Sequence, residues 1–486
     1  MNRKMIVYIL GYVLILEAIL MLLPAFVAII YAEKAGFSFL IVSAISALLG
    51  FLITRKKPKV TIFYLKEGCV ATALSWIVLS IFGALPFVIS GSIPSFTDAL
   101  FETISGFTTT GASILNEVES LPYSILFWRS FTHWIGGMGV LVFLLAIVPM
   151  NGGSHMNLMR AESPGPSVGK LVPKVKHTAR ILYLIYMGIT IVEIILLLFG
   201  GMGIFDAVTT SFGTAGTGGF GIKNDSIGGY NAYIQWIVTI FMILFGVNFN
   251  AYYYMLYRKW KKAFGMEEVK WYLIVIAAAV GGLMFTAYDG TITFFHNLRD
   301  MSFQVASVIT TTGFSTVDFD KWPEISRFIM IAVMFVGACA GSTGGGIKVS
   351  RFIIAVKNIG KELGGYLHPK GVKKTYLEGK PVEHEVSRAV NVYFEAFFLI
   401  FALSMMLISF EGYDGVTNFT AIVATMNNIG PGLNMVGPTQ NFGFFSNFSK
   451  YVLMFDMLAG RLELFPMLLL FHPSIWKLAV AKKKGH

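Results

Sequence analysis

The sequence carries little charge for its length. Of its 486 residues, 13% are Asp, Glu, Lys or Arg, and the mean hydropathy is +0.68. Soluble domains carry about 25% charged residues, so the low charge excludes an ordinary soluble domain. The two cysteines, Cys69 and Cys339, lie in or beside apolar segments, which excludes a disulfide framework. His133 has no second histidine at helical spacing and no nucleophile–base pair stands out, so neither a metal centre nor an enzyme is predicted.

The chain is instead rich in long apolar runs. A helix needs roughly 20 apolar residues to cross the hydrocarbon core of a bilayer. Runs near this length cover 5–31, 37–54, 70–90, 125–148, 181–200, 234–257, 271–288, 328–340, 389–410 and 451–471. The first run lacks a small-residue cleavage site and a second run follows it, so it is interpreted as an anchor and not a signal peptide. The pattern predicts an all-α polytopic membrane protein.

The positive charge is distributed unevenly along the chain, whose net charge is +11. Basic clusters lie between the apolar runs at 3–4, 55–59, 160–180, 258–262, 348–380 and 477–484. Linkers at the opposite ends of the runs are poor in Lys and Arg and richer in acid. The positive-inside rule then places both termini and every basic cluster in the cytoplasm. The basic residues are topology signals, so membrane lipid is an expected partner and nucleic acid is not.

A tetrapeptide rich in threonine and glycine recurs along the chain. TTTG occurs at 108–111 and 310–313, a related GTGG at 216–219 and NNIG at 427–430. The copies are about a hundred residues apart, which suits a repeat built of paired helices. The residues that align with one another are Thr109, Thr110 and Gly111; Thr217, Gly218 and Gly219; Thr311, Thr312 and Gly313; and Asn428, Ile429 and Gly430.

A short, mostly apolar stretch precedes each tetrapeptide. These stretches are about ten residues long, too short to span a bilayer, and are predicted to be re-entrant half-helices entered from outside. Asp98, Asp206, Asp300 and Thr417 stand at their starts and are predicted to be the N-caps. Each unit is therefore a span, a half-helix, an extended loop and a returning span.

Four such loops, related by pseudo-fourfold symmetry, are predicted to converge on one pore. Non-helical backbone survives at membrane depth only where it is buried in protein or lines water. Backbone carbonyls of the loops would replace the hydration shell of a cation, as in selectivity filters. The C-terminal ends of the half-helices would add negative potential at the same place. The twelve aligned residues are thus the candidate filter, holding K⁺ through backbone carbonyls only.

Several segments together resemble a known family. They are GFTTTGAS, RSFTHWIGGMGV at 129–140, ITTTGFS, GACAGSTGGGIKVSR at 337–351 and NNIGPG. Over essentially the whole chain, the sequence resembles the Trk/Ktr/HKT superfamily of potassium transporters, including two extra N-terminal spans. The resemblance implies potassium uptake in the inner membrane of a prokaryote and a homodimer with one pore per protomer. It also implies a cytosolic nucleotide-binding regulator of the TrkA type, which would carry the NAD or ATP. The extra glycine of the second tetrapeptide departs from the TTTG pattern and predicts a more flexible loop.

A second glycine-rich segment interrupts the apolar run before residue 348. Its residues Gly341, Ser342, Thr343, Gly344, Gly345 and Gly346 are predicted to unwind the helix at membrane depth. The resemblance implies that this segment is an intramembrane gating loop. Lys348 either assists the gate or marks the cytosolic interface. Arg461 is costly in hydrocarbon and therefore a functional candidate; the resemblance implies contact with the gating loop, and the alternative is an ion pair with Glu463 or Asp456.

The units are assigned as two extra spans at 1–60 and four pore repeats at 61–155, 156–262, 263–365 and 366–486. Together they predict uptake of K⁺, and of Rb⁺, through a gated, channel-like pore. The alternative is a secondary symporter coupled to H⁺ or Na⁺ with alternating access. Glu17, Glu193 and Glu395 could be proton-relay groups, although packing against polar neighbours or a site near the membrane interface is favoured. Transporters with broken helices carry inverted repeats, whereas these units share one orientation, which favours a pore.

Overall fold

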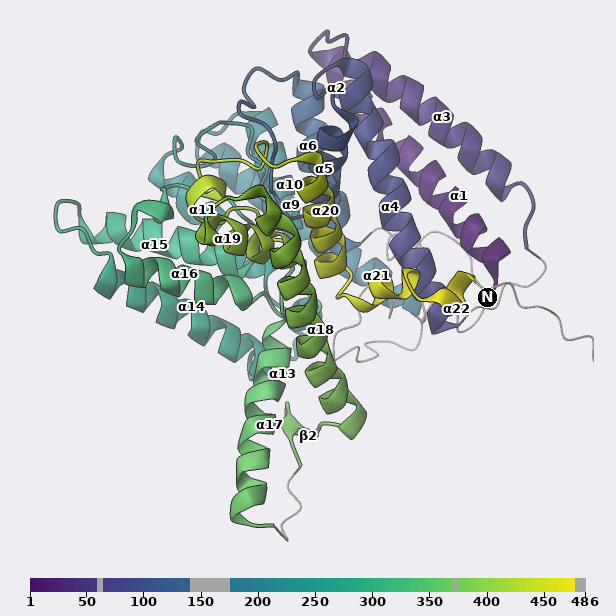
Figure 1. The fold of residues 1–486 in the computed structure, drawn as a ribbon. Coiled ribbons are helices and arrows are strands. Elements are labelled where there is room, and N and C mark those ends of the chain that lie inside the picture. Colours follow the sequence, from purple (N-terminus) through teal and green to yellow (C-terminus); the bar gives the residue numbers. More distant parts are fainter. Residues whose placement is uncertain (59–63, 140–174, 370–373, 477–486) are drawn as a thin grey trace, which may run out of the picture.

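The computed structural model describes residues 1–58, 64–139, 175–369 and 374–476 and is almost entirely helical (Figure 1). The helices are α1 (Arg3–Leu20), α2 (Leu22–Ile30), α3 (Gly36–Thr54), α4 (Leu65–Ser90), α5 (Phe96–Phe107), α6 (Tyr123–Met138), α9 (Val175–Phe199), α10 (Ile204–Gly216), α11 (Ala232–Phe245), α12 (Phe249–Leu256), α13 (Trp260–Gly265), α14 (Glu267–Thr286), α15 (Phe294–Ile309), α16 (Glu324–Phe335), α17 (Val349–Leu367), α18 (His384–Ile408), α19 (Gly415–Met426), α20 (Asn447–Arg461), α21 (Phe465–Leu470) and α22 (Pro473–Trp476). A small antiparallel hairpin pairs β1 (Tyr376–Leu377) with β2 (Lys380–Pro381).

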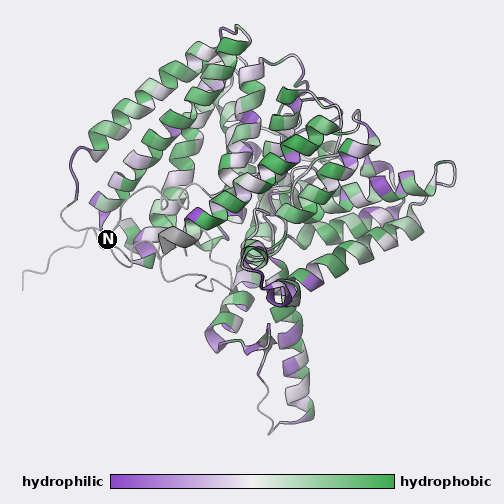
Figure 2. Ribbon diagram, turned by 180° about the vertical axis from the view of Figure 1, so that it is seen from behind, coloured by the Kyte–Doolittle hydropathy of each residue, from purple (hydrophilic) through white to green (hydrophobic). Residues whose placement is uncertain are grey.

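Six helices in the described residues are long and apolar enough to cross a membrane, and the bent pair α11 and α12 adds a seventh candidate. In α3, α9, α14 and α18, between 22 and 39% of the most apolar window is buried, so most of these surfaces face outward. In Figure 2 the long outer helices are mostly green, which marks hydrophobic residues. Outward-facing apolar surface of this extent suits lipid as the solvent. The prediction of an all-α polytopic membrane protein is confirmed.

Some predicted spans are not single helices. The chain bends by 91° between α11 and α12, within the run at 234–257. The run at 328–340 leaves the helix after Phe335, and the run at 451–471 leaves it after Arg461. The run at 125–148 is helical to Met138, and its remainder lies outside the described residues. Hydropathy alone could not show these breaks, because the residues at each break remain mostly apolar.

Short helices precede all four tetrapeptides, as predicted. The helices α5, α10, α15 and α19 contain 12, 13, 16 and 12 residues. The helices that follow the tetrapeptides, α6, α11, α16 and α20, are also short, with 16, 14, 12 and 15 residues. The predicted unit boundaries at 60/61 and 155/156 lie outside the described residues.

The predicted N-caps of the half-helices are wrong. The residues that cap α5, α10, α15 and α19 are Ser95, Gly203, Thr293 and Asp414. Asp98, Asp206 and Thr417 instead occupy the third helical position, while Asp300 lies in the second turn of α15, paired with Arg299 at 3.2 Å. Two residues near the start of α19, Asp414 and Thr417, are both suitable N-caps. Asp414 is the one that caps the helix, because its carboxylate accepts from the N–H groups of Val416 and Thr417 at 3.0 and 2.9 Å.

Candidate ion site

All four half-helices end in the same backbone motif. The N–H of the residue before the last glycine of each tetrapeptide bonds to a carbonyl five residues earlier, at 2.8 Å in every case: Thr110 to Ser105, Gly218 to Gly213, Thr312 to Ser307 and Ile429 to Ala424. The preceding residue is left-handed, with φ of 55° at Thr109, 55° at Thr217, 59° at Thr311 and 56° at Asn428. This is the Schellman closure, in which glycine is the usual left-handed residue. A β-branched threonine there is a genuine outlier, typical of strain kept for a function.

The last glycines bring the four loops into contact. Their φ values are 79°, 78°, 85° and 97° at Gly111, Gly219, Gly313 and Gly430. A Cβ placed on each would lie 2.0, 2.0, 2.3 and 2.7 Å from the carbonyl oxygens of Gly218, Thr312, Ile429 and Thr110, respectively. Each glycine therefore contacts the carbonyl that precedes the glycine of the next loop, and the fourth contact returns to the first loop. The tetrapeptides form a closed ring in chain order.

A polar cavity opens onto this ring. The cavity is open to solvent on one side, its empty volume including that open solvent is about 780 Å³, and all four ring glycines are among its lining residues. Ser113, Asn116, Asn224 and Gln440 contribute polar groups, and Arg129 also reaches the lining. The carbonyl ring thus lies at the edge of a space that water or an ion can occupy.

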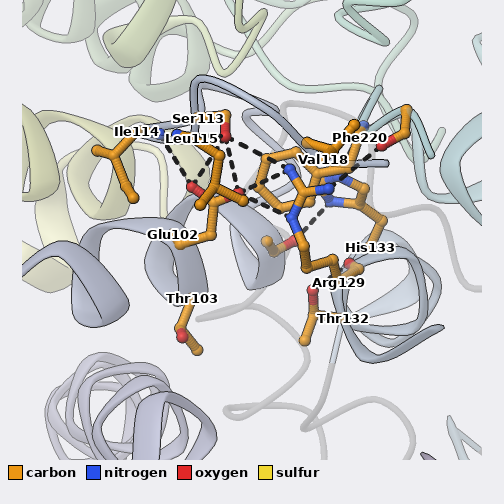
Figure 3. Close-up of polar contacts among 12 residues, drawn as sticks. Glu102, Thr103, Ser113, Ile114, Leu115, Val118, Arg129, Thr132, His133 and Phe220 are labelled. Carbon is orange, nitrogen blue, oxygen red and sulfur yellow. Dashed lines mark hydrogen bonds and ion pairs between the residues drawn. The ribbon is translucent and has the colours of Figure 1, made fainter. Parts of the chain in front are cut away.

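A buried ion pair supports the first two loops from behind (Figure 3). Glu102 on α5 accepts from Arg129 on α6, at 2.9 Å from Nε and 2.7 Å from Nη2. The same carboxylate accepts from the Ser113 hydroxyl and from the Ile114 N–H at 3.0 Å. Arg129 also donates to the Gly221 carbonyl at 3.2 Å, beyond the second tetrapeptide. The pair therefore fixes the exits of both loops.

His133 joins the same two loops and lies beside the pair in Figure 3. Its Nε2 accepts from the Phe220 N–H at 3.1 Å, so its Nδ1 donates to the Gly106 carbonyl at 2.8 Å. A Cβ on Gly218 would lie 2.1 Å from the His133 ring. The second tetrapeptide therefore has glycine because an imidazole packs against its backbone. The sequence predicted a more flexible loop from this glycine; in the structure the glycine makes room for the His133 ring, which also accepts a hydrogen bond from the end of the same loop.

The segment between α16 and α17 lies directly against the ring. It is non-helical, as predicted, with a parallel bridge between Val336 and Ile347. The Gly345 N–H donates to the Thr311 hydroxyl at 2.6 Å. Cβ atoms on Gly344 and Gly345 would lie 3.0 and 2.9 Å from the carbonyl oxygens of Thr310 and Asn427, at the ends of two half-helices. We call residues 341–346 the inner loop.

Side chains from other helices hold the inner loop. Arg461, on the last turn of α20, donates to the Thr343 carbonyl at 2.9 Å and to the Gly136 and Gly137 carbonyls at 2.5 and 2.9 Å. Lys348 is buried and folds back onto the carbonyls of Gly344 and Gly345. Two cationic side chains, Arg461 and Lys348, therefore donate hydrogen bonds to backbone carbonyl oxygens of the inner loop.

The acids considered as partners of Arg461 bond elsewhere. Glu463 pairs with Arg351, and Asp456 accepts from the Ser404 hydroxyl at 2.8 Å. A third acid, Glu268 on α14, accepts at one oxygen from the N–H groups of Ala340 and Ser350, at 2.7 and 3.1 Å. One carboxylate therefore joins the two ends of the inner loop.

Sequence reasoning missed Glu102, Arg129 and Glu268 as supporting residues. Arg129 carried a usable signal, because it lies inside the apolar run at 125–148 and a charge at that depth is costly. Glu268 carried none, since it lies beside Glu267 at the start of a span, where acids are ordinary. Among the other buried candidates, Glu17 on α1 and Glu193 on α9 are fully enclosed. Glu395 on α18 is exposed.

The fold and this site define a multi-pass helical membrane protein in which the loops after four short helices meet in one ring. Residues 34–478 match the family model TrkH, described as a cation transport protein. The chain therefore belongs to the TrkH family of cation transport proteins.

Bacterial proteins are similar in sequence to this chain over almost its whole length. The Trk system potassium uptake protein TrkH of Salmonella typhimurium is 37% identical, covering 98% of this chain and 100% of its own. The Escherichia coli Trk system potassium uptake protein TrkG is 32% identical, covering 98% and 99%. The crystal structure of the potassium transporter TrkH from Vibrio parahaemolyticus superposes with a TM-score of 0.87 at 32% identity, covering 98% and 100%. These names confirm a bacterial transport protein that is not an enzyme.

Proposed function

We propose that this protein takes up K⁺ across the cell membrane through one gated pore, whose filter is the closed ring of tetrapeptides. The ring contacts carry the proposal, because each loop touches the next and the series closes after four. The relatives named above are called potassium uptake proteins. The names of these relatives support K⁺ as the transported ion, and the ring of backbone carbonyls supports a site that holds a cation.

The ring has the chemistry to hold a dehydrated K⁺ or Rb⁺. Left-handed and ordinary residues alternate through each tetrapeptide, so that neighbouring carbonyls turn toward the same side. Four loops then present stacked rings of oxygens that replace the hydration shell. The half-helix C-termini add negative potential, which is strongest within the last turn. K⁺ is the transported substrate and is held by backbone oxygens alone.

The inner loop is the gate of this proposal. Its contacts reach all four units: Thr310 and Asn427 at the half-helix ends, the Phe245 carbonyl through Thr343, and the end of α6 through Arg461. The inner loop itself thus touches three of the four units, and Arg461 ties it to the fourth, so it lies across the axis of the pseudo-fourfold arrangement. Arg461 and Lys348 add positive charge to this steric barrier, and at low effective dielectric that charge strongly repels a passing cation.

Regulation would reach the gate from the cytoplasm. The helix α17 and the first turns of α18 project from the helical body together with the β1–β2 hairpin, at the bottom of Figure 1. This projection carries basic residues of the linker 351–380, which the positive-inside rule assigns to the cytoplasm together with both termini. We propose that a TrkA-type ring, which binds NAD or ATP, pulls on this linker in a homodimer of the inner membrane.

Rb⁺ flux into liposomes tests the proposal. The purified protein should admit radioactive Rb⁺ down its gradient, at a rate that does not change when a proton or sodium gradient is imposed. Na⁺ should compete poorly. Flux that requires either gradient would support the alternative of ion-coupled symport and contradict the pore.

A further inference from the structure

The turn that follows Arg461 has an unusual backbone. Glu463 is left-handed with φ of 55°, and Leu464 has φ of 70° and ψ of −57°. The Phe465 N–H bonds back to the Glu463 carbonyl at 2.9 Å. These angles and this bond describe a classic γ-turn centred on Leu464, a rare and strained conformation. Strain of this kind persists only where surrounding contacts impose it, and it gathers in switch regions.

An ion pair holds this turn. The Glu463 carboxylate accepts from the guanidinium of Arg351, and both side chains are less than a tenth exposed, at 9% and 6%. Arg351 also lies over the Tyr393 ring of α18, with 3.9 Å from Cζ to the ring centroid. A buried ion pair is weak evidence for stability, because desolvation offsets its attraction. Its best-attested use is to fix one arrangement among several.

Arg351 stands between the inner loop and the cytoplasmic projection. It is in the first turn of α17, five residues beyond Gly346. Its neighbour Ser350 is bonded to Glu268 on α14 at 3.1 Å. A displacement of α17 therefore acts on the base of the inner loop through the chain and on the Arg461 turn through the ion pair.

We propose that Arg351 and Glu463 are positioning residues that hold the strained turn and so keep Arg461 on the Thr343 carbonyl. When α17 moves, the pair separates, the turn relaxes, and Arg461 withdraws from the inner loop. The inference rests on the proposed function, in which this loop is the gate. It adds a route by which one movement releases both the loop and the arginine that pins it.

A double-mutant cycle in liposomes without regulator tests this route. Arg351→Gln should raise Rb⁺ flux several-fold while the K⁺ to Na⁺ preference stays at the wild-type value. In an Arg461→Ala background the same substitution should add nothing, because the arginine that the pair positions is already gone. A merely structural pair would still change flux in that background, which would overturn the proposal. Glu463→Gln repeats the cycle from the other partner should the first variant fold poorly.

Two further variants sharpen the result. Arg327→Gln removes the ion pair with Asp320, 3.1 Å long and near the start of α16, without touching α17 or the Arg461 turn, and should leave flux at the wild-type rate. Exchanging the charges, with Arg351→Glu and Glu463→Arg together, should restore low flux. If Arg461→Ala alone fails to raise flux, the gate assignment falls. If it raises flux and Arg351→Gln then raises it again, only the positioning route falls.

Discussion

Two glycine-rich parts of the molecule, the tetrapeptide ring and the inner loop, are held in different ways. In the ring, glycine Cα atoms lie against carbonyl oxygens of the next loop, so the closure is made by the backbone itself. The inner loop has backbone bonds to α11 and α12, from the Phe249 N–H to the Gly341 carbonyl and from the Thr343 N–H to the Phe245 carbonyl, and it is held in addition by side chains: Arg461 and Lys348 on its carbonyls and Glu268 at its two ends. A backbone closure has no side chain that a movement elsewhere could withdraw. A loop fastened by side chains can be released by moving the helices that carry them.

The largest effect is expected from breaking the ring. Gly111→Ser and Gly313→Ser should each abolish most of the K⁺ preference over Na⁺, because the new Cβ would lie 2.0 or 2.3 Å from a backbone oxygen. The neighbouring loop must then shift, and its carbonyls leave the ion. Reversal potentials under K⁺ and Na⁺ gradients measure the change.

Gly412→Ser is the matched control for these ring variants. Gly412 also has a positive φ, of 77°, but a Cβ there would have nothing within 4 Å. Its selectivity should equal that of the wild type. Unchanged reversal potentials in both ring variants would contradict the four-loop filter.

The next effect concerns the inner loop. Arg461→Ala, or a deletion within 341–346, should raise Rb⁺ flux without regulator, because a positive charge or part of the steric barrier is removed. Ion preference should hardly change, since the ring is untouched. Flux through the purified, folded variants in liposomes is the measurement. Equal or lower flux in both would contradict the gate, and altered preference would assign this loop to the filter.

A smaller effect is expected behind the ring. Glu102→Gln leaves the buried Arg129 without its anionic partner, which typically costs about 3–5 kcal/mol of stability for a buried pair. The variant should unfold at lower temperature and lose part of its K⁺ preference, because the exits of two loops loosen. Gln304→Met offers the comparison on α15, where the buried amide donates to the Thr316 hydroxyl at 3.3 Å and to the Val317 carbonyl at 3.2 Å. It keeps most of the side-chain volume and should cost about 1 kcal/mol for each neutral hydrogen bond lost. Equal losses in the two variants would show that the charge is not important.

The smallest effect is expected at the N-terminal end of α10. Asp206→Ala removes a hydrogen bond from the Tyr230 hydroxyl of 2.8 Å and a negative charge near a helix N-terminus. The loss should be roughly 1 kcal/mol because the site is partly exposed. Tyr230→Phe removes the same bond but keeps the Asp206 charge at the helix N-terminus, so its loss in thermal unfolding should be smaller, with selectivity unchanged in both. Loss of K⁺ preference without loss of stability would place Asp206 in the filter.

Much of the site could be predicted from the sequence because its signals are local. Glycine tolerates positive φ and close approach, so the repeated tetrapeptides indicated four special backbone turns before any contact was known. The half-helices were predictable from length alone, and the glycines of 341–346 predicted the break in a span. The caps were mispredicted because Ser95, Thr293 and Asp414 compete with the acids chosen, and propensity ranks all of them as good caps.

The sequence by itself determined the membrane class, the positions of the four loops and the presence of Arg461 in an apolar run, since hydropathy and backbone preferences act over a few residues. Only the tertiary structure decided which carbonyl each glycine meets, why Gly218 must leave room for His133, and that Arg461 bonds to Thr343 while Glu463 bonds to Arg351. These choices join residues that are close in space and distant in the chain. They depend on how whole helices pack, which no local pattern encodes.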